Sequence, residues 1–212
     1  MKKIFITLSL VLLIMLNFSL FTDAYYEADI TDYITDRIIT IRQKAYNTNT
    51  ALPDARAREY AEEIVYWTNY YSRKTGFYID PLIVTAIIEA ETNFVSRDIY
   101  DSGTSIGISS MKIATAKDIA RELNVDYNKW RMLDATDLGI RFTVHYIARA
   151  YEIFDGDLKR VIVSYNRGYR GARIRSREEL QINYLFRVEN RYNQYRKVMG
   201  MTDFNTVYNN SK

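Results

Sequence analysis

The sequence predicts an all-α protein. Beyond residue 53, apolar residues recur at the three- and four-residue spacing of amphipathic helices, and the alternating pattern of strands is nearly absent. The 212 residues include two prolines and eight glycines, too few for a chain rich in loops or strands. A hydrophobic content of 48% is enough for a buried core. The length suits one helical domain preceded by a targeting segment.

The first helix of this domain is expected over residues 53–74. Pro53 and Asp54 are typical of a helix start, and Gly76 is typical of a residue that follows a helix end. One stripe of the segment contains Tyr60, Ile64, Trp67 and Tyr71. This stripe predicts that one face of the helix packs against the core.

The second helix is expected from Asp80 to about Val95. Asp80 is a good N-cap, and Pro81 fits the first helical position, where no backbone N–H is needed. The apolar residues at helical spacing are Leu82, Ile83, Ala86, Ile87 and Ala90. One face of this helix is therefore expected to be buried.

Turn residues and caps divide the rest of the chain. Asp134 is expected to cap a long helix, whereas Gly168 and Gly171 are expected to break one. The segment 96–111 is rich in Ser and Gly and is expected to be a loop. The remaining expected helices run over residues 115–123, 134–154, 159–166 and 178–199.

The N-terminal region resembles a targeting segment. Lys2 and Lys3 precede a mostly apolar run over residues 4–21, and Thr22-Asp23-Ala24 is a weak small-residue cleavage site. Because about 18 apolar residues approach membrane-spanning length, an uncleaved anchor is the alternative. The expected organisation is a signal peptide or membrane anchor over 1–24, a short helix and linker over 25–52, the helical domain over 53–200 and a tail over 201–212.

Composition excludes several classes of function. The net charge of +3, without a long basic run, argues against nucleic-acid binding. The chain has no cysteine, which excludes a disulfide framework and a lipid anchor on cysteine. His145 is the only histidine, and its position in mid-helix favours a packed or surface role. We therefore expect no cofactor and no metal site.

Residues 81–116 contain the main candidate for chemistry. A helix-length apolar stretch ends at Glu91, which Thr92, Asn93 and Phe94 follow directly. Glu89 and Glu91 lie about 200° apart around a helix, so only one of them can face a given cleft. A carboxyl that is desolvated against an apolar wall stays protonated near neutral pH and suits a general acid. The alternative is that both are ordinary surface carboxylates.

Tyr165 and Asn166 form a second candidate. Gly168 and Gly171 follow them and indicate a sharp backbone path. The functional interpretation places Tyr165 and Asn166 in a groove that faces Glu91, and the alternative is a plain helix end. Gly103 and Gly107 likewise indicate either a close approach of the backbone to a ligand or only a tight loop.

The central stretch resembles the lytic transglycosylase family, whose SLT catalytic domain is similar to goose-type lysozyme. That family has Asp-Pro entering a helix and Glu-Ser-x-Phe further on, where this chain has Asp80-Pro81 and Glu91-Thr92-Asn93-Phe94. A Gly-Ala-x-Gly-Leu-Met-Gln segment and a Thr-Ala helix start follow in the family. Here residues 104–110 occupy that segment, and Thr115-Ala116 opens the helix.

The resemblance continues towards the C-terminus. The Asn-Ile and Tyr-Leu pairs of the family correspond in spacing to Gly139-Ile140 and Tyr146-Ile147. Its Phe-x-Gly-Asp and Ala-Tyr-Asn-x-Gly segments correspond to residues 154–157 and 164–168. Together these pieces cover residues 76–172, and more loosely 56–198. The departures are Thr104 for the first glycine of the loop, Ser110 for the glutamine and Ser164 for the alanine.

This resemblance implies a lysozyme-like (SLT) helical domain and a mechanism with one carboxyl. Glu91 would protonate the β-1,4 glycosidic oxygen between N-acetylmuramic acid and N-acetylglucosamine. It would then take the proton of the muramyl C6 hydroxyl, which closes a 1,6-anhydro ring. Ser110, Tyr146, Tyr165 and Asn166 would bind substrate, with Tyr165 hydrogen-bonded to Glu91.

Two alternatives remain at this stage. A goose-type lysozyme, which is a hydrolase, would need a second acid such as Asp98 or Asp101 to hold water. A non-catalytic glycan-binding scaffold is suggested by Ser110 in place of the family glutamine. The implied partner is the glycan strand of peptidoglycan, in the periplasm or cell envelope. Cell-wall turnover and insertion of a secretion or flagellar apparatus are equally open uses, with envelope machinery or the inner membrane as further partners.

Overall fold

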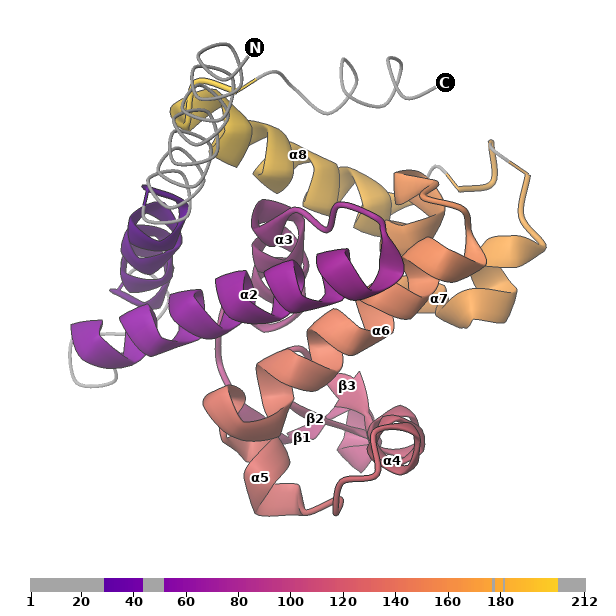
Figure 1. The fold of residues 1–212 in the computed structure, drawn as a ribbon, viewed down its shortest axis with the longest axis horizontal. Helices are drawn as coiled ribbons and strands as arrows, with labels where there is room; N and C mark the ends of the chain where they lie inside the picture. Colours follow the sequence, from indigo (N-terminus) through magenta and orange to yellow (C-terminus); the bar gives the residue numbers. More distant parts are fainter. Residues whose placement is uncertain (1–28, 44–51, 177, 181, 202–212) are drawn as a thin grey trace, which may run out of the picture.

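The computed structural model describes residues 29–43, 52–176, 178–180 and 182–201 of the chain (Figure 1). Its helical elements are residues 29–43, α2 (Asp54–Thr75), α3 (Pro81–Thr92), the turn η2 (Asp101–Gly103), α4 (Ile113–Glu122), α5 (Lys129–Leu133), η3 (Ala135–Gly139), α6 (Ile140–Ile153), α7 (Leu158–Arg173) and α8 (Asn183–Val198). Helices thus form most of the described chain, and the predicted all-α class is confirmed.

A small antiparallel sheet occupies the segment that the sequence indicated to be a loop. Its strands are β1 (Arg97–Tyr100), β2 (Ser105–Gly107) and β3 (Met111–Lys112), in the order β1-β2-β3. Ser105 lies opposite Lys112, and Ile106 opposite Met111. The expectation of a loop over 96–111 was wrong because strands of two to four residues are too short to show an alternating pattern.

Several helix boundaries also differ from the expected ones. The helix α4 begins at Ile113 instead of residue 115, and α8 begins at Asn183 instead of residue 178. Asn93 adopts a left-handed conformation with φ of 51°, which ends α3 at Thr92 instead of Val95. Asp134 caps a helix as expected, but that helix is the π-helical η3, and α6 begins only at Ile140. α7 continues past Gly168, whose backbone (φ 72°, ψ 162°) departs from helical geometry. The five-residue α5 is too short for a periodicity signal.

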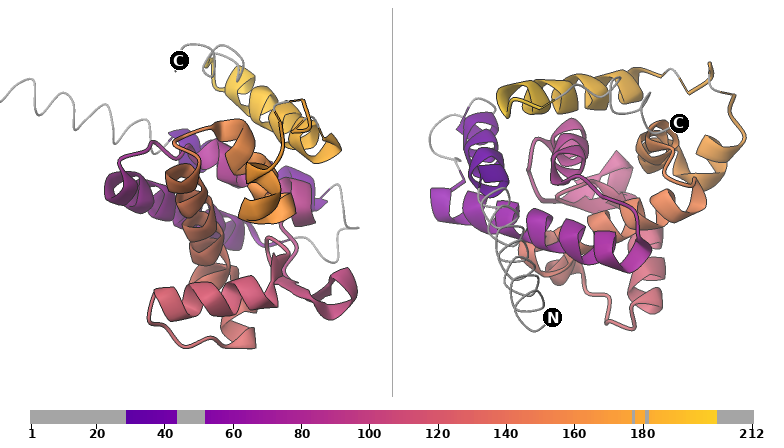
Figure 2. Two further views of the ribbon diagram at one scale, coloured as in Figure 1. Left: turned by 90° about the vertical axis from the view of Figure 1, so that its right-hand side faces the viewer. Right: turned by 45° about the horizontal axis from the view of Figure 1, so that its top comes forward.

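The helix α3 lies at the centre of the molecule, between α2 and α8 (Figure 2). Every residue from Pro81 to Glu89 is buried, so this part of the helix is covered on all sides. The sequence pattern had predicted burial of one face only. A helix that is apolar all round is typical of such a central position. The Asp80 side chain accepts from Leu82 N at 2.9 Å, which confirms the predicted cap.

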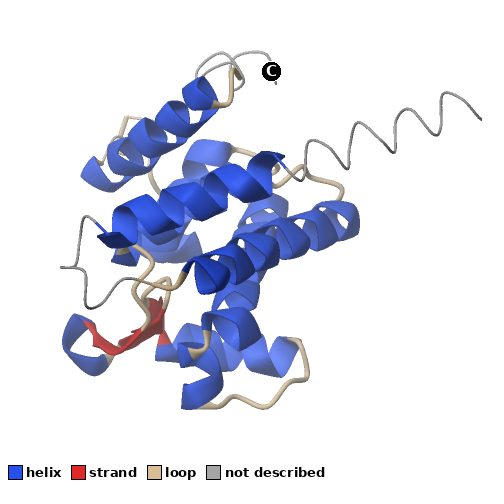
Figure 3. Ribbon diagram, turned by 90° about the vertical axis from the view of Figure 1, so that its left-hand side faces the viewer, coloured by secondary structure: helices blue, strands red, loops and turns tan. Residues whose placement is uncertain are grey.

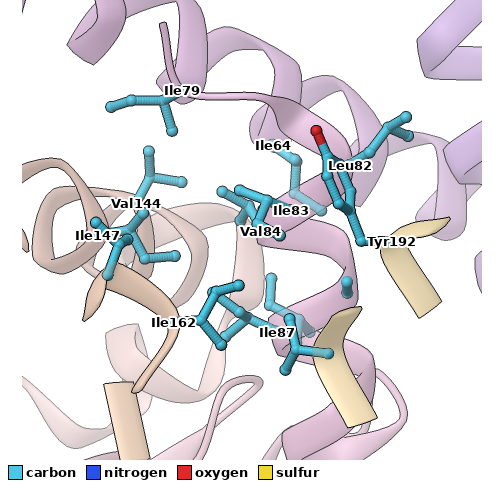
Figure 4. Packing of buried hydrophobic residues seen from close by; sticks show 14 of the residues in the cluster. Ile64, Ile79, Leu82, Ile83, Val84, Ile87, Val144, Ile147, Ile162 and Tyr192 are labelled. Atoms are coloured by element: carbon cyan, nitrogen blue, oxygen red, sulfur yellow. The ribbon is translucent and has the colours of Figure 1, made fainter. Parts of the chain in front are cut away.

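The main core surrounds this helix. In Figure 4, Leu82, Ile83 and Ile87 of α3 lie among apolar side chains of α2, α6 and α7. The labelled partners from these helices are Ile64, Val144, Ile147 and Ile162, all of them fully buried. Because these contacts join segments far apart in sequence, the core fixes how the end of α3 faces α6 and α7.

A second buried cluster lies beside the sheet, which appears in red in Figure 3. It contains Ile106, Met111, Ala116, Ile119, Ala120, Met132, Leu138 and Phe142. The α6 helix contributes to both clusters, through Phe142 here and through Val144 and Ile147 in the main core. The molecule therefore has two packed regions joined by α6.

Glu89 of α3 connects the first and last described helices. Its carboxylate accepts two hydrogen bonds from Arg37, both at 2.8 Å, and one from Arg191 of α8 at 3.0 Å. Tyr195 of α8 donates a further hydrogen bond to it. Glu89 is only 3% exposed, so the interpretation of Glu89 as a surface carboxylate was wrong.

Asp80, at the N-terminal end of α3, also binds α8. Its second oxygen accepts from Tyr192 at 2.6 Å and from Arg196 at 2.9 Å, both on α8. Four side chains along α8 thus donate hydrogen bonds to the carboxylates of Glu89 and of the N-cap Asp80. These donors are Arg191, Tyr192, Tyr195 and Arg196. These hydrogen bonds set the rotation of α8 about its axis.

The N-terminal part of the described chain belongs to this assembly. Ile30, Ile34 and Ile38 are buried in the main core at the four-residue spacing of one helix face. Among the residues described, no helix combines the length and the hydrophobicity needed to cross a membrane. The predicted signal peptide or anchor over 1–24 lies outside the described residues.

Gly107 provides a test of packing between β2 and α5. A Cβ atom there would lie 2.9 Å from the Met132 carbonyl oxygen, and φ is +83°. We expect Gly107→Ala to lower the free energy of unfolding by about 2–4 kcal/mol, from backbone strain and overpacking. Gly103→Ala is the matched control, because its φ of +88° is similar but no atom lies within 4 Å. Equal losses in urea unfolding of the two variants would contradict the proposed clash.

Candidate functional site

A cavity of about 380 Å³ opens beside the C-terminal end of α3. Four parts of the fold line it: the end of α3, the sheet together with the start of α4, the helix α6, and the second half of α7. The lining residues are Glu91, Asp101, Ser105, Ser110, Met111, Lys112, Thr115, Tyr146, Tyr165, Asn166, Arg167 and Gly168. All five site residues expected from the sequence, Glu91, Ser110, Tyr146, Tyr165 and Asn166, therefore surround one cavity.

Glu91 is the half-buried acid of this cavity. Burial raises the pKa of its carboxyl from 4.5 to about 7. The neighbouring Tyr184 hydroxyl and Arg187 guanidinium hold this pKa lower than burial alone would, whereas Asp101 raises it further. A large fraction of the Glu91 carboxyl is consequently protonated at neutral pH. Such a group can donate a proton and take it back near pH 7.

Tyr184 and Arg187 were missed by the sequence analysis. Both lie on the first turns of α8, and the Arg187 guanidinium stands 5.6 Å from the centre of the Tyr184 ring. Arg187 also donates to the Ala90 carbonyl oxygen at 3.2 Å, next to Glu91. The Tyr184 hydroxyl is buried and close enough to shift the pKa of Glu91, yet its geometry falls short of a hydrogen bond.

Their position depends on contacts that a sequence pattern does not display. The only local signal is that Tyr184 and Arg187 are three residues apart and so share a helix face. That this face meets Glu91 follows from the hydrogen bonds of Asp80 and Glu89 to the remainder of α8. These contacts join residues about a hundred positions apart in the chain.

Glu89 and Glu91 lie in opposite environments, as their spacing on the helix predicted. Glu91 lines the cavity, whereas Glu89 points to Arg37, Arg191 and Tyr195. Although burial opposes ionisation, the hydrogen bonds from Arg37 and Tyr195 lower the pKa of Glu89. Glu89 is thus a buried anion that holds helices together, and Glu91 is the carboxyl available to a ligand.

Tyr165 and Tyr146 form an aromatic wall of the cavity. Their rings meet edge to face, with centroids 5.4 Å apart. The Tyr165 hydroxyl donates to the Ser109 carbonyl oxygen at 3.2 Å, so the expected hydrogen bond from Tyr165 to Glu91 was wrong. The Tyr146 hydroxyl donates to the Ser164 carbonyl oxygen at 2.9 Å. Burial raises the pKa of both phenols, which therefore remain neutral and act as rigid walls.

Backbone geometry positions the polar residues of the cavity. The departure from helical geometry at Gly168 follows Asn166 and Arg167 directly, and all three line the cavity. Ser110 sits in a left-handed conformation with φ of 50°, between β2 and β3. Gly107 approaches the α5 backbone and Gly103 lies in an open turn, so neither glycine is needed for space at the cavity.

The two acids considered as a second catalytic carboxyl are placed differently. Asp101 lines the cavity and accepts a hydrogen bond from Ser105 Oγ at 2.8 Å. Asp98 forms an exposed ion pair with Lys129 at 3.2 Å. Asp101 is therefore the one that shares a cavity with Glu91.

His145 has the packed role that its sequence position favoured. Its ring lies between the Tyr71 hydroxyl at 3.0 Å and the Glu122 carboxylate at 3.1 Å. Burial lowers its pKa. Within the described part of the chain, no group of three or more histidine or acidic side chains is arranged to hold a metal ion.

A helical domain with a small antiparallel sheet beside a half-buried glutamate is the arrangement of the lysozyme-like fold. The family model of the transglycosylase SLT domain matches residues 69–186, more than half of the chain. The chain therefore belongs to the transglycosylase SLT domain family.

A solved structure of similar fold is the lytic transglycosylase Slt from Pseudomonas aeruginosa, in an inactive glutamate-to-glutamine mutant. The TM-score is 0.54 at 18% sequence identity, over 78% of this chain and 31% of that chain. At this identity the likeness concerns the fold, and the present protein spans about a third of the length of that enzyme. A search of curated proteins finds no match.

Proposed function

We propose that this protein is a peptidoglycan lytic transglycosylase in which Glu91 is the single catalytic acid and base. The observation that carries the proposal is one half-buried carboxyl, with its pKa raised to about 7, in a cavity between the two packed regions. The family supports transglycosylase chemistry, and the lysozyme-like fold is compatible with a glycan strand as substrate.

The first step is proton donation. Neutral Glu91 protonates the glycosidic oxygen between N-acetylmuramic acid and N-acetylglucosamine, and the C1–O bond breaks. The 2-acetamido oxygen of the muramyl residue bonds to C1 and stabilises the developing cation, which is the task of the second carboxyl in most glycosidases. The leaving sugar carries the proton away, and Glu91 remains as a carboxylate.

The second step returns the proton to Glu91. The carboxylate removes the proton from the muramyl C6 hydroxyl, whose oxygen attacks C1 and displaces the acetamido oxygen. The 1,6-anhydro ring closes without water, and Glu91 is again protonated. The Tyr184 hydroxyl and the Arg187 guanidinium favour the carboxylate between the two steps, because both lower the pKa of Glu91.

The remaining lining residues are proposed to hold the glycan. Asn166 and Ser110 present short polar groups to the sugar, and Tyr146 and Tyr165 supply fixed ring surfaces. Ser110 is shorter than the family glutamine, so a bridging water can take the place of one direct hydrogen bond. The proposed place of action is the periplasm or cell envelope, where peptidoglycan lies.

Asp101 supports a second candidate function, a goose-type lysozyme. Because it lines the same cavity, its carboxylate could hold a water that attacks C1. This hydrolase and the transglycosylase both cleave glycan, whereas the third alternative, a glycan-binding scaffold, does not.

Digestion of purified cell walls tests whether the protein cleaves glycan at all. We expect the protein to clear a turbid suspension of cell walls and to release soluble muropeptides. Binding to cell walls without any release would instead favour the scaffold. The Glu91→Gln variant is the control for release by a contaminating enzyme.

The pH profile tests the role assigned to Glu91. The acid form is needed first, so kcat/KM should be high below the pKa of about 7 and fall about tenfold per pH unit above it. Tyr184→Phe removes a group that lowers this pKa, so the falling limb should move to higher pH. Tyr165→Phe is the matched control, because its hydroxyl binds Ser109, and its limb should stay in place. A limb unaffected by Tyr184→Phe would contradict the assigned contact.

A further inference from the structure

A second hollow, of about 530 Å³, adjoins the cavity of Glu91. Its lining residues are Asn166, Arg167, Ile182, Asn183, Tyr184 and Arg187. Asn166 and Arg167 line both spaces, so the two spaces lie next to each other. We name this second space the arginine hollow. Its lining residues come from the second half of α7 and from Ile182 with the start of α8, two helices that Figure 1 labels.

The arginine hollow carries positive charge without a compensating acid. Two of its six lining residues are arginines, and none is aspartate or glutamate. Arg167 is exposed and makes no ion pair with any residue that the structure describes. Arg187 uses one nitrogen for the Ala90 carbonyl oxygen and lies over the Tyr184 ring, which fixes its direction. Its other N–H groups remain for a ligand.

The chemistry of these side chains selects an anion with oxygen acceptors. A guanidinium presents several N–H donors in a plane that fits a carboxylate. Asn166 and Asn183 add amide donors and acceptors, as a peptide group requires. The hollow therefore suits a carboxylate attached to an amide-bearing chain better than a plain sugar.

We propose that the arginine hollow binds a carboxylate on the O3 substituent of the muramyl residue that occupies the Glu91 cavity. This inference rests on the proposed function, since it takes muramic acid as the substrate. That substituent is a lactyl group, which has a free carboxylate in bare glycan and carries a peptide stem with its own carboxylates in peptidoglycan. The structure assigns the carboxylate to Arg167 and Arg187, and the two sources require separate tests.

Steady-state cleavage of three soluble glycan substrates distinguishes these sources. The substrates are peptide-bearing strands with free carboxylates, the same strands with the carboxylates amidated, and peptide-free strands with free lactyl carboxylates. We expect amidation to raise KM about 3- to 10-fold with little change in kcat, as for loss of a partly exposed charged contact. The preference should shrink in high salt. A preference for the acidic peptide stem identifies the stem as the source, and a preference for the peptide-free strand identifies the lactyl group.

Arg167→Gln is the decisive variant. The variant's KM for the preferred acidic substrate should rise to the KM of the wild type for the amidated substrate. Its kcat should stay within about twofold of the wild-type kcat. Arg170→Gln is the matched control, an exposed arginine on the same helix that lines neither space, and it should behave as wild type. A charge preference that survives Arg167→Gln, or that is absent from wild type, would overturn the proposal.

Binding measurements separate a failure of the hollow from a failure of the proposed function. The Glu91→Gln protein is titrated with a soluble muramyl peptide, either acidic or amidated, and followed by NMR. Tighter binding of the acidic form, lost in Arg167→Gln and in Arg187→Gln, supports the hollow even if no glycan is cleaved. Equal binding of both forms excludes the peptide stem as the source. If muramic acid with a free lactyl carboxylate also binds no more tightly than its amide, the hollow is refuted, whether or not the wild type cleaves glycan.

Discussion

Glu91→Gln should lose at least about 100-fold of the cell-wall-cleaving activity, the magnitude typical of a removed general acid and base. The amide keeps the shape of the side chain but cannot donate a proton and recover it. The fold should persist, because Glu91 makes no ion pair with any other residue in the described chain. Release of soluble muropeptides from purified cell walls measures the loss, and the circular dichroism spectrum checks the fold.

The same substitution should increase stability in a manner that depends on pH. Below about pH 4.5 the carboxyl is protonated in both the folded and unfolded states, so Glu91→Gln and wild type should be equally stable. As the pH rises towards 7, the unfolded chain ionises first and wild type loses stability. Above pH 7 the variant should be more stable by up to about 3 kcal/mol, at 1.36 kcal/mol per pKa unit. Urea unfolding at pH 4 and pH 8 tests the sign.

Glu89→Gln should have the opposite effect on stability. It leaves the partly buried Arg37 and Arg191 without their counter-charge, which we expect to cost about 2–4 kcal/mol, reduced from the fully buried case by the exposure of both arginines. The pKa of Glu89 is lowered, so wild type should hold this advantage above about pH 4.5 and lose it as the pH falls through the folded pKa.

The two variants form a matched pair, with the same chemical change two residues apart on one helix. Glu91→Gln should be inactive and stable, whereas folded Glu89→Gln should be active and less stable. An active Glu91→Gln together with an inactive, fully folded Glu89→Gln would show that the two roles have been exchanged. Activity is therefore compared at a temperature where unfolding curves show both variants to be folded.

The fold was predictable wherever one strong local signal dominated. Asp80, with Pro81 after it, marked the start of α3, and the glutamate spacing showed that two carboxylates would face opposite sides. The family resemblance implied that Glu91, Ser110 and Tyr165 share one groove, and all three line the cavity. Capping and helical periodicity are local properties, so a single sequence carries them.

Other features depend on tertiary contacts. The strands of the sheet are too short for periodicity, and the hydrogen bond of Tyr165 to the Ser109 carbonyl links positions 56 residues apart. Tyr184 reaches Glu91 only because Glu89 and Asp80 orient α8. Arg37, Arg191 and Tyr195, which bind Glu89, all lie outside the family match over 69–186. Segments beyond the family domain thus help to position its candidate acid.

The central claim is that Glu91 acts alone, without a catalytic water. Mass spectrometry of muropeptides released in water enriched in heavy oxygen tests it most directly. The account predicts muramyl ends one water lighter than the hydrolytic product and free of the heavy isotope. Reducing muramyl ends that carry one heavy oxygen would contradict the account and would assign the chemistry to a hydrolase, with Asp101 as the acid that holds the water.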